Sequence, residues 1–390
     1  MKALVIAPQP FFTPRGTPFS VYYRTLVTAQ HGVQVDLLTY GEGQDVDIPG
    51  VRIIRIPRFR SLGNVKVGPS RLKLFLDVFI FLRAVGLMMR NRYDFVHAHE
   101  ESVFFCRWLK PLFGFKLVYD MHSSLPQQLT NFKFTRSRKL IRLFEKLEVS
   151  SLSSAEAVIT ICPELAEYAV PRMPDASRHI LIENSIFEDV RLKEAVAHDA
   201  SPNGHAHLPE GRPIVLYAGT FEPYQGLDIL IPAIAKARES RPDIFLLMVG
   251  GNDEQVARYR DLAARCGLEG HSLFTGRTPQ SQAKAYAQRA AVVTSPRIEG
   301  TNTPLKVYEQ LASGIPLVAT RILSHTQVLT DDVCFLVDPT VESMAEGIVA
   351  AIGDEGRRAR VVANARSLYE RNYSRPAYER KMQQLLSLLR

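Results

Sequence analysis

The feature that most constrains the fold of this 390-residue chain is the alternation of short apolar runs with longer segments of helical periodicity. The runs are rich in Val, Ile and Leu, as expected for strands buried on both faces of a sheet. Alternation of this kind is typical of parallel sheets covered by helices on both faces. In chain order the runs are residues 2–7, 33–40, 94–99, 116–120 and 157–162, then 213–219, 244–250, 272–276, 291–295 and 316–320. The two groups predict an α/β protein with two Rossmann-like, doubly wound domains.

A polar segment rich in Pro, Gly, Asn and His separates the two groups of runs. We therefore predict an N-terminal domain over residues 1–189, a linker or loop over 190–212 and a C-terminal domain over 213–374. The four cysteines are far apart and form no CxxC pair, and no histidines accompany them at the spacing of a structural zinc site. We expect no disulfide framework and no metal site, and the cysteine content suits a reducing cytoplasm.

Positive charge is concentrated in the first half of the chain. Residues 1–180 carry a net charge of +9, and the remainder carries −1. Most of the excess lies in residues 51–60 and 131–146, where Lys and Arg alternate with apolar residues. A solvated face and an anionic membrane surface both explain this pattern, and nucleic acid is the partner we favour least.

The longest apolar stretch, residues 74–89, contains Asp77 and Arg83 and is too short to span a bilayer. We predict that it forms a mostly buried crossover helix.

Loops after strands carry the functional signal, because ligands of open α/β sheets bind at the carboxyl ends of the strands. Gly16 follows the first predicted strand and would let the backbone approach a ligand closely. His122 follows the strand predicted at 116–120, where a functional and a purely structural histidine are equally plausible. The chain has neither a GxGxxG nor a Walker A motif, so we expect no nicotinamide cofactor and no P-loop.

Residues 300–314, GTNTPLKVYEQLASG, predict a helix that begins near Pro304 and stops at Gly314. Lys306 then lies in the first turn, where a cation opposes the helix dipole. One interpretation is that an anion binds free backbone N–H groups of this turn and the lysine closes over it. The other is a solvent-exposed lysine that pairs with Glu309.

The segment SPRIEGTNTPLKVYEQLASGIPLVAT (295–320) resembles the donor-site signature of the retaining nucleotide-sugar glycosyltransferases of family 4, which have the GT-B fold. The resemblance extends to further segments in the same order and so covers essentially the whole chain. These segments are PRGTP (14–18), DFVHAHEE (94–101), YAGTFEPYQGLDILIPAIAKA (217–237), MVGG (248–251) and LFTGR (273–277).

The resemblance implies roles for particular residues. Glu309 would hold the ribose hydroxyls of the nucleotide, Arg277 would meet its base, and His122 would lie near the transferred sugar. Gly16 would approach the diphosphate from the first domain. The helix over 375–390 would return towards that domain. The remaining residues implied at the donor site are Gly219, Thr220, Gln225, Arg297, Thr301, Asn302, Thr303, Pro304 and Leu305.

The sequence departs from the family pattern at three positions. The family usually has an Arg and a Lys that neutralise the diphosphate where this chain has Thr220 and Gln225. It also usually has a glutamate where this chain has Thr301, while Glu299 stands two residues earlier. We hypothesise that Lys306 or Arg297 restores the missing positive charge, because charge stabilisation is often the largest catalytic contribution.

The activity implied is transfer of a sugar, with retained configuration and without a metal or other cofactor. The donor would be a nucleoside-diphosphate sugar, and the acceptor a hydroxyl group of a lipid-linked or cell-envelope glycan. The catalytic residues would be His122, Lys306 and Glu299, in a cytoplasmic protein that sits peripherally on a membrane. Two alternatives remain: an epimerase of the same fold that uses Glu299, and a membrane- or nucleic-acid-binding protein with a degenerate sugar site.

Overall fold

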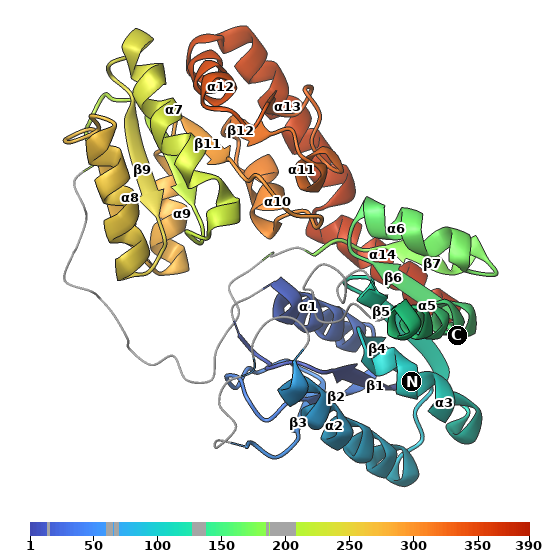
Figure 1. Ribbon diagram of the computed structural model, residues 1–390. Helices are drawn as coiled ribbons and strands as arrows, with labels where there is room; N and C mark the ends of the chain where they lie inside the picture. The colour runs from blue at the N-terminus through green and yellow to red at the C-terminus, as the bar shows by residue number, and fades with distance from the viewer. Residues whose placement is uncertain (14–15, 60–64, 66–69, 127–137, 185–186, 188–207) are drawn as a thin grey trace. The chain divides into compact units, whose positions relative to one another are not determined.

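The structure is a computed structural model that describes all residues except 14–15, 60–64, 66–69, 127–137, 185–186 and 188–207 (Figure 1). It divides into two compact units. Unit 1 comprises Met1–Val196 and Arg375–Arg390, and unit 2 comprises Ala197–Ser374. Each unit contains one parallel sheet, so the predicted class of two Rossmann-like, doubly wound α/β domains is confirmed. Most of the linker predicted over 190–212 lies outside the described residues.

The sheet of unit 1 is wound in both directions from β1. Its strands are β1 (Lys2–Ala7), β2 (Gln34–Thr39), β3 (Val51–Arg55), β4 (Phe95–His99), β5 (Lys116–Met121), β6 (Ala157–Thr160) and β7 (His179–Leu181). They run parallel in the order β3-β2-β1-β4-β5-β6-β7. The order reverses between β1 and β4, and this is where doubly wound sheets bind ligands.

Helices cover both faces of this sheet and enclose two hydrophobic cores. They are α1 (Gly16–Gln30), α2 (Arg71–Arg90), α3 (Ser102–Phe113), α5 (Arg138–Ser154), α6 (Pro163–Ala169) and α14 (Arg375–Leu388). One core includes side chains of α1 and α14, and the other includes side chains of α2 and α3. The last helix of the chain therefore packs among elements from its first half (Figure 1). Its Tyr378, Met382 and Leu385 are buried there.

Unit 2 repeats the architecture with six strands. These are β8 (Ile214–Ala218), β9 (Phe245–Val249), β10 (Ser272–Gly276), β11 (Val292–Ser295), β12 (Leu317–Thr320) and β13 (Phe335–Val337). They run parallel in the order β10-β9-β8-β11-β12-β13, so the switch point lies between β8 and β11. The loops after these two strands contain the Thr220–Gln225 and Arg297–Leu305 segments singled out from the sequence.

The helices of unit 2 are α7 (Leu227–Ser240), α8 (Asp253–Arg265), α9 (Gln280–Gln288), α10 (Leu305–Ala312), α11 (Leu323–Thr326), α12 (Val341–Gly353) and α13 (Glu355–Asn372). Side chains cap the first turn of three of these helices, which are α8, α12 and α13. A capping box between Asn252 and Gln255 starts α8, and Thr340 caps α12. The predicted helix around Lys306 is α10, which follows Pro304 and is terminated near Gly314, a glycine with φ of 77°.

All ten predicted strands are present, and the described residues form three further strands that were not predicted. The strands β7 and β13 are three residues long, too short for a clear pattern. The third, β3, lies in the basic stretch 51–60, where the sequence suggested an exposed charged surface. Arg52 is exposed and also forms two hydrogen bonds with Asp36, and Arg55 donates to the carbonyls of Glu42 and Gln44.

The prediction that residues 74–89 form a mostly buried helix is wrong in one respect. They lie in α2, as predicted for a crossover helix, but only one side of α2 packs on the sheet. Side chains such as Leu74 and Leu82 are 59% and 58% exposed. No helix among the described residues is long and apolar enough to cross a bilayer.

Candidate functional site

Four loops meet at the carboxyl edge of the sheet in unit 2. The Gly219 N–H donates to the carbonyl of Val249, and the Gly250 N–H donates to the carbonyl of Gly276. These bonds bring the ends of β8, β9 and β10 together and place Arg277, which is exposed, at the same edge. A Cβ on Gly250 would lie 1.9 Å from the Gly219 carbonyl oxygen. Only glycine permits this approach.

The loops after β8 and β11 are locked together in the same way. Gly226 has φ of +71°, and a Cβ there would lie 2.0 Å from the carbonyl oxygen of Pro296. The Ile298 N–H donates to the Tyr224 carbonyl at 2.9 Å. The Thr220–Gln225 and Arg297–Leu305 segments are therefore adjacent.

Lys306 points into this junction from the first turn of α10. Its Nζ lies 4.2 Å from the centroid of the Tyr217 ring, and 3.4 Å from the position that a Cβ on Gly219 would occupy. The Nζ atom is buried and has no hydrogen-bond partner among the described residues. Burial, with a smaller contribution from Arg297, lowers the pKa of Lys306 to about 7. The interpretation of Lys306 as a solvent-exposed lysine is therefore wrong.

Tyr217 positions this lysine and was not found from the sequence. Its hydroxyl donates a 2.6 Å hydrogen bond to the carbonyl of Thr220, which fixes the ring beneath the ammonium. The face of an aromatic ring attracts a cation and partly replaces the water that Lys306 has lost. The only sequence signal was an aromatic residue near the end of a buried strand, which a core residue would give equally.

Arg297 lies beside Lys306, but its guanidinium is hydrogen-bonded to backbone carbonyls of its own loop. Its guanidinium donates to the carbonyls of Glu299 at 2.5 Å and Asn302 at 3.4 Å. It also lies 5.1 Å from the Tyr224 ring centroid. Arg297 thus holds the turn before α10 in shape, whereas Lys306 carries the unpaired charge.

Other predicted donor-site residues line the same junction. Gln225 is 9% exposed, and its amide donates to the hydroxyl of Thr220 at 3.4 Å. The Gln225 Oε1 and the Thr303 Oγ1 are buried without a hydrogen-bond partner in the described part of the chain. Unsatisfied buried polar atoms are rare in folded proteins and often mark where a ligand binds. Three such atoms, Gln225 Oε1, Thr303 Oγ1 and Lys306 Nζ, belong to residues that the sequence assigned to one site.

The exposed members of the predicted set surround these buried atoms. Glu299 and Thr301 are exposed on the loop before α10, and the Thr301 carbonyl accepts a hydrogen bond from Gln327. Asn302, Pro304 and Leu305 are partly buried, and Pro304 is the N-cap of α10. Glu309 is exposed one turn further along the helix.

His325 is a neutral residue of the same region. It is fully buried, its Nδ1 lies 2.8 Å from the Thr320 carbonyl, and its Nε2 lies 2.9 Å from the Ser295 hydroxyl. The Nδ1–H therefore donates, and Nε2 accepts from Ser295. Burial, opposed by the Thr320 carbonyl and reinforced by Lys306 and Arg297, lowers the pKa of His325 to about 4. His325 therefore adds no positive charge to the site at neutral pH, and Lys306 and Arg297 are the groups that can.

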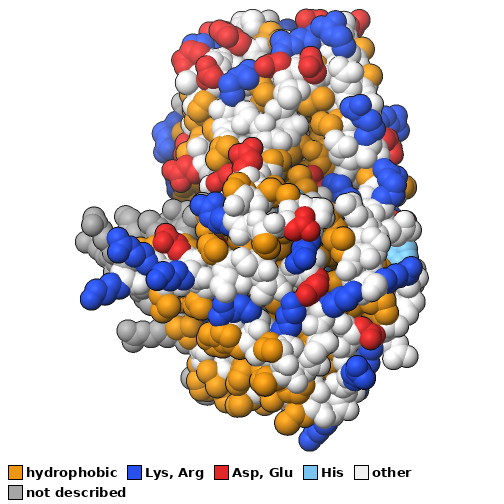
Figure 2. Space-filling model, turned by 90° about the vertical axis from the view of Figure 1, so that its right-hand side faces the viewer, with side chains coloured by type: hydrophobic (Ala, Val, Ile, Leu, Met, Phe, Trp, Pro, Cys, Tyr) orange, Lys and Arg blue, Asp and Glu red, His pale blue; other side chains and the backbone are white. Residues whose placement is uncertain are grey.

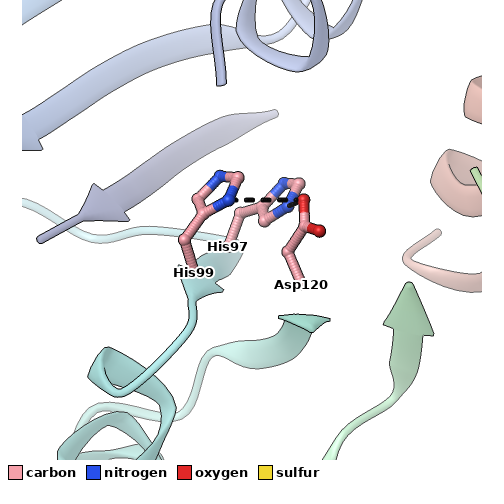
Figure 3. A group of neighbouring side chains, drawn as sticks. All are labelled: His97, His99 and Asp120. Atoms are coloured by element: carbon pink, nitrogen blue, oxygen red, sulfur yellow. Dashed lines mark hydrogen bonds and ion pairs between the residues drawn. The ribbon is translucent and has the colours of Figure 1, made fainter. Parts of the chain in front are cut away.

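Unit 1 holds a second polar cluster at the carboxyl ends of β4 and β5. Asp120, on β5, is fully buried, and its carboxylate faces His97 and His99 (Figure 3). Its Oδ2 lies 2.6 Å from Arg24 Nε and 2.9 Å from His97 Nε2, and its Oδ1 lies 3.2 Å from His122 Nε2. His99 Nδ1 lies 3.2 Å from His122 Nε2. His122 is therefore one of three histidines gathered around a single carboxylate.

The charges in this cluster balance. Burial alone would raise the pKa of Asp120, but the Arg24 guanidinium holds it well below its usual value. Burial lowers the pKa of His97 and lowers that of His99 strongly, so both rings are neutral at pH 7. The sequence analysis did not predict His97 and His99 as site residues, because it considered only the histidine that follows a strand end, His122. The HAH pattern of β4 puts both rings on one face of the strand, beside Asp120 on its neighbour.

The cluster is a poor fit for a metal ion. His97, His99 and Asp120 each offer a ligand atom within 4.8 Å of the others. However, Arg24 Nε lies 2.6 Å from the same Asp120 oxygen that faces His97. A divalent cation bound there would lie next to a guanidinium in a buried, low-dielectric setting. The arrangement is that of an ion pair supported by neutral imidazoles.

Gly16 and His122 lie in unit 1, and all the other predicted site residues lie in unit 2. Gly16 is the first residue of α1, which follows β1 next to the switch point of the sheet. Two doubly wound parallel-sheet units, each with polar residues at its switch point, define the GT-B class of protein.

Comparisons with known proteins identify the family within that class. The profile described as "Glycosyl transferases group 1" matches residues 204–368, and the profile "Glycosyl transferase 4-like domain" matches residues 23–185. The chain belongs to the family 4 glycosyltransferases of GT-B fold, and it is a glycosyltransferase.

Curated relatives and solved structures match most or all of the chain. Phosphatidyl-myo-inositol mannosyltransferase of Mycobacterium leprae is 24% identical, with 93% of this chain and 90% of the relative covered. D-inositol 3-phosphate glycosyltransferase of Xylanimonas cellulosilytica is 25% identical, with 88% and 84% covered. Sucrose-phosphate synthase from Thermosynechococcus elongatus superposes with a TM-score of 0.72 at 21% identity, with 100% and 98% covered. Anabaena HepE, solved in complex with UDP, gives 0.71 at 16% identity, with 99% and 100% covered.

Proposed function

We propose that this glycosyltransferase transfers a sugar from a nucleoside-diphosphate donor to a hydroxyl group of a lipid-linked or cell-envelope acceptor, with retained anomeric configuration and without a metal. The observation that carries the proposal is the buried, unpaired ammonium of Lys306 at the N-terminus of α10. A lysine that is desolvated without a counter-ion is costly to the fold. An anionic ligand at this position supplies the missing partner.

The chemistry of the site suits a diphosphate. The helix N-terminus offers backbone N–H groups and a positive dipole end, and Lys306 adds a positive charge. Lys306 lies beside Gly219 and the loop of Thr220 and Gln225, where family members usually carry cations. We assign it their role, with Arg297 shaping the turn. Positive charge from these groups can stabilise the leaving diphosphate without a metal.

The reaction follows from that arrangement. The bond from the anomeric carbon to the leaving phosphate oxygen breaks, and the acceptor oxygen bonds to the same face of the sugar. The acceptor proton passes to the leaving phosphate. Glu309 would hold the ribose, Arg277 the base, and Glu299 the sugar hydroxyls.

His122 would orient the sugar, as the family resemblance implies. Its Nε2 already faces Asp120 and His99, so its position is fixed by buried neighbours. A side chain held in this way loses little entropy when substrate binds. We infer a positioning and hydrogen-bonding role for His122 rather than that of a strong base.

The class of acceptor is supported by the relatives, one of which is named for transfer to phosphatidyl-myo-inositol. A lipid-linked acceptor would be met at a membrane surface, and we place the protein on the cytoplasmic side, as a peripheral protein. The solved HepE complex holds UDP, which supports a nucleoside-diphosphate donor for this fold.

Thermal melting of the full chain with UDP, GDP and ADP tests the donor site. A nucleotide at about 100 times its Kd should stabilise the protein by about 2.7 kcal/mol. Lys306→Ala should abolish the shift, while Lys236→Ala should keep it, because Lys236 pairs with Glu342 on an exposed surface. Equal shifts in both variants would refute the assignment of Lys306.

Product analysis tests the reaction itself. Incubation with the stabilising nucleotide's sugars and a lipid-linked acceptor should give a glycoside with the anomeric configuration of the donor. Incubation with donor alone should leave the sugar stereochemistry unchanged. A changed sugar without acceptor would indicate an epimerase instead.

A further inference from the structure

Helix α2 is apolar on two opposite sides. Its inner side packs into the core through Leu76, Ile80, Ala84 and Leu87. Its outer side exposes five large apolar residues spaced along one face: Leu74, Phe75, Val78, Leu82 and Met89, which are 59, 43, 54, 58 and 71% exposed. An exposed apolar stripe of this length on a helix marks an interaction surface.

The neighbouring helices extend the stripe. On α3, Trp108 is 58% exposed and Leu112, one turn later, is 75% exposed. On α5, Leu143 is 51% exposed. Helix α2 packs against α3, and α3 packs against α5, so the side chains form one surface. We call it the outer apolar face: Leu74, Phe75, Val78, Leu82, Met89, Trp108, Leu112 and Leu143. It accounts for eight of the thirteen large hydrophobic residues that the described part of the chain exposes.

The three helices that form this face carry mainly positive charge. The three helices contain ten Lys and Arg residues and three Asp and Glu residues. Two of the three acids point inward, since Asp77 accepts a hydrogen bond from Tyr40 and Glu148 accepts from Ser124 and Tyr168. Figure 2 shows hydrophobic side chains gathered at the lower end of the molecule, with Lys and Arg beside them.

The exposed basic residues form a rim on both sides of the stripe. By helical spacing, Arg83 and Arg90 lie on the side of α2 away from α3. Lys139, Arg142 and Lys146 are exposed on α5, on the other side of the stripe. The basic residues thus flank the apolar stripe of α2 and stand beside Leu143 on α5, and Arg107 lies 5.5 Å from the centroid of the Trp108 ring on α3.

We propose that the outer apolar face is a docking surface for an anionic lipid bilayer, with α2 lying in the plane of the interface. Apolar side chains would enter the acyl boundary, Trp108 would lie at headgroup level, and the basic rim would contact anionic headgroups. The inference extends the proposed function to a specific surface, but rests on different residues from the donor site.

A second copy of the chain is a weaker candidate for the partner. A two-fold symmetric contact through this face would bring the same patch of both copies together. The basic rims would then oppose one another, which is unfavourable. An anionic bilayer complements both the apolar stripe and the rim.

Trp108 is the single tryptophan of the chain, so its fluorescence reports on this face alone. Vesicles containing phosphatidylglycerol should shift its emission to shorter wavelength, and brominated acyl chains should quench it. Pure phosphatidylcholine vesicles should bind at least tenfold more weakly, and salt should weaken binding to phosphatidylglycerol. Equal binding to both lipids, or an unchanged Trp108 spectrum with phosphatidylglycerol, would overturn the proposal.

Leu82→Glu tests the apolar stripe, and Leu323→Glu is its matched control in unit 2, where Leu323 is 51% exposed. We expect Leu82→Glu to weaken binding to phosphatidylglycerol vesicles by about tenfold or more, and Leu323→Glu to leave it unchanged. Both variants should melt like the parent, because neither side chain is buried. Unchanged binding by Leu82→Glu would refute the assignment of the face. A blue shift that depends on protein concentration, without vesicles, would indicate a second copy instead.

The outcome is separable from that of the donor site. Leu82→Glu should retain its nucleotide-induced thermal shift, and Lys306→Ala should retain vesicle binding. Failure of vesicle binding with an intact nucleotide shift would overturn the docking surface alone.

Discussion

The ammonium of Lys306 lies 4.2 Å from the centre of the Tyr217 ring, and the Tyr217 hydroxyl is tied to the carbonyl of Thr220. The aromatic face is the main compensation that the described residues provide for a charge removed from water. Such a contact is worth about 2 kcal/mol when desolvated. This is less than the cost of burying a lysine, so Lys306 is held ready for an anion at the expense of stability.

Replacing Lys306 should therefore stabilise the fold. The pKa of Lys306 in the folded protein, about 7, is below its value in the unfolded chain. Between pH 7 and about 10 the unfolded chain binds more protons, so the free energy of unfolding rises with pH in this window. We expect Lys306→Met to raise the free energy of unfolding at pH 7 by about 1–3 kcal/mol, with a smaller gain at pH 10. Urea unfolding at both pH values measures this. Lys236→Met is the control, and a less stable Lys306→Met would contradict the prediction.

Nucleotide binding should be accompanied by proton uptake. At pH 8 the low pKa leaves Lys306 largely neutral, and a bound diphosphate favours its charged form. Calorimetric titration with the stabilising nucleoside diphosphate, in buffers of different ionisation enthalpy, should give uptake of up to about one proton at pH 8 and less at pH 6. Lys306→Met should abolish the difference between buffers. Proton uptake that persists in this variant would assign the proton to another group.

A lysine at position 225 should restore function to the Lys306→Ala variant. Gln225 is buried next to Thr220, in the loop after β8. In Gln225→Lys/Lys306→Ala a cation again faces the diphosphate, at the position that the family usually uses. We expect Lys306→Ala to lose about 100-fold or more in kcat/KM, and the double variant to regain at least tenfold. A double variant no better than Lys306→Ala would show that the location of the charge matters more than its presence.

Gly226→Ala should damage the donor site more than the fold of unit 2. The new Cβ would meet the carbonyl oxygen of Pro296 at 2.0 Å, in a left-handed conformation. The loops after β8 and β11 must then separate, which moves Lys306 relative to Gly219. We expect a loss of about 1–3 kcal/mol in stability and of the nucleotide-induced thermal shift. Gly267→Ala is the control, since it has φ of +72° but no atom within 4 Å of the new Cβ. Loss of the nucleotide shift in this control too would remove the special role of Gly226.

Arg24 should be essential to the stability of unit 1. Arg24→Met would leave the buried carboxylate of Asp120 without its main counter-charge. We expect a loss of about 3–5 kcal/mol, measured by urea unfolding, and partial recovery in Arg24→Met/Asp120→Asn. Arg321→Met, which breaks an exposed pair with Asp331, should cost at most about 1 kcal/mol. No recovery in the double variant would show that Arg24 acts through packing.

The sequence was most informative where one local pattern determined one structure. Buried strands such as β1 and β8 are continuous apolar runs, and Gly314 ended α10 as predicted because few other residues adopt its backbone conformation. The pattern could not distinguish a helix that is apolar because it is buried from one that is apolar on a free surface. For that reason the exposure of Leu74 and Leu82 was missed.

The proximity of candidate site residues was predicted best when they shared a loop. Thr303 and Lys306 belong to one turn, so their proximity was implied by the chain itself. Tyr217 and His97 depend on pairing between strands, and a single sequence does not state which strands are neighbours. The burial of the Lys306 ammonium was equally out of reach, because it depends on the ring of a residue 89 positions earlier.

The packing of α14 on unit 1 makes unit 2 an insertion within the first unit's chain. The sequence changes from one unit to the other twice, at Val196–Ala197 and at Ser374–Arg375. A single proteolytic cut in the first connection would leave the halves covalently joined. A fragment that ended at residue 196 would lack the side chains of Tyr378, Met382 and Leu385 from its core, so a soluble version of unit 1 requires the final sixteen residues to be supplied in cis or as a peptide.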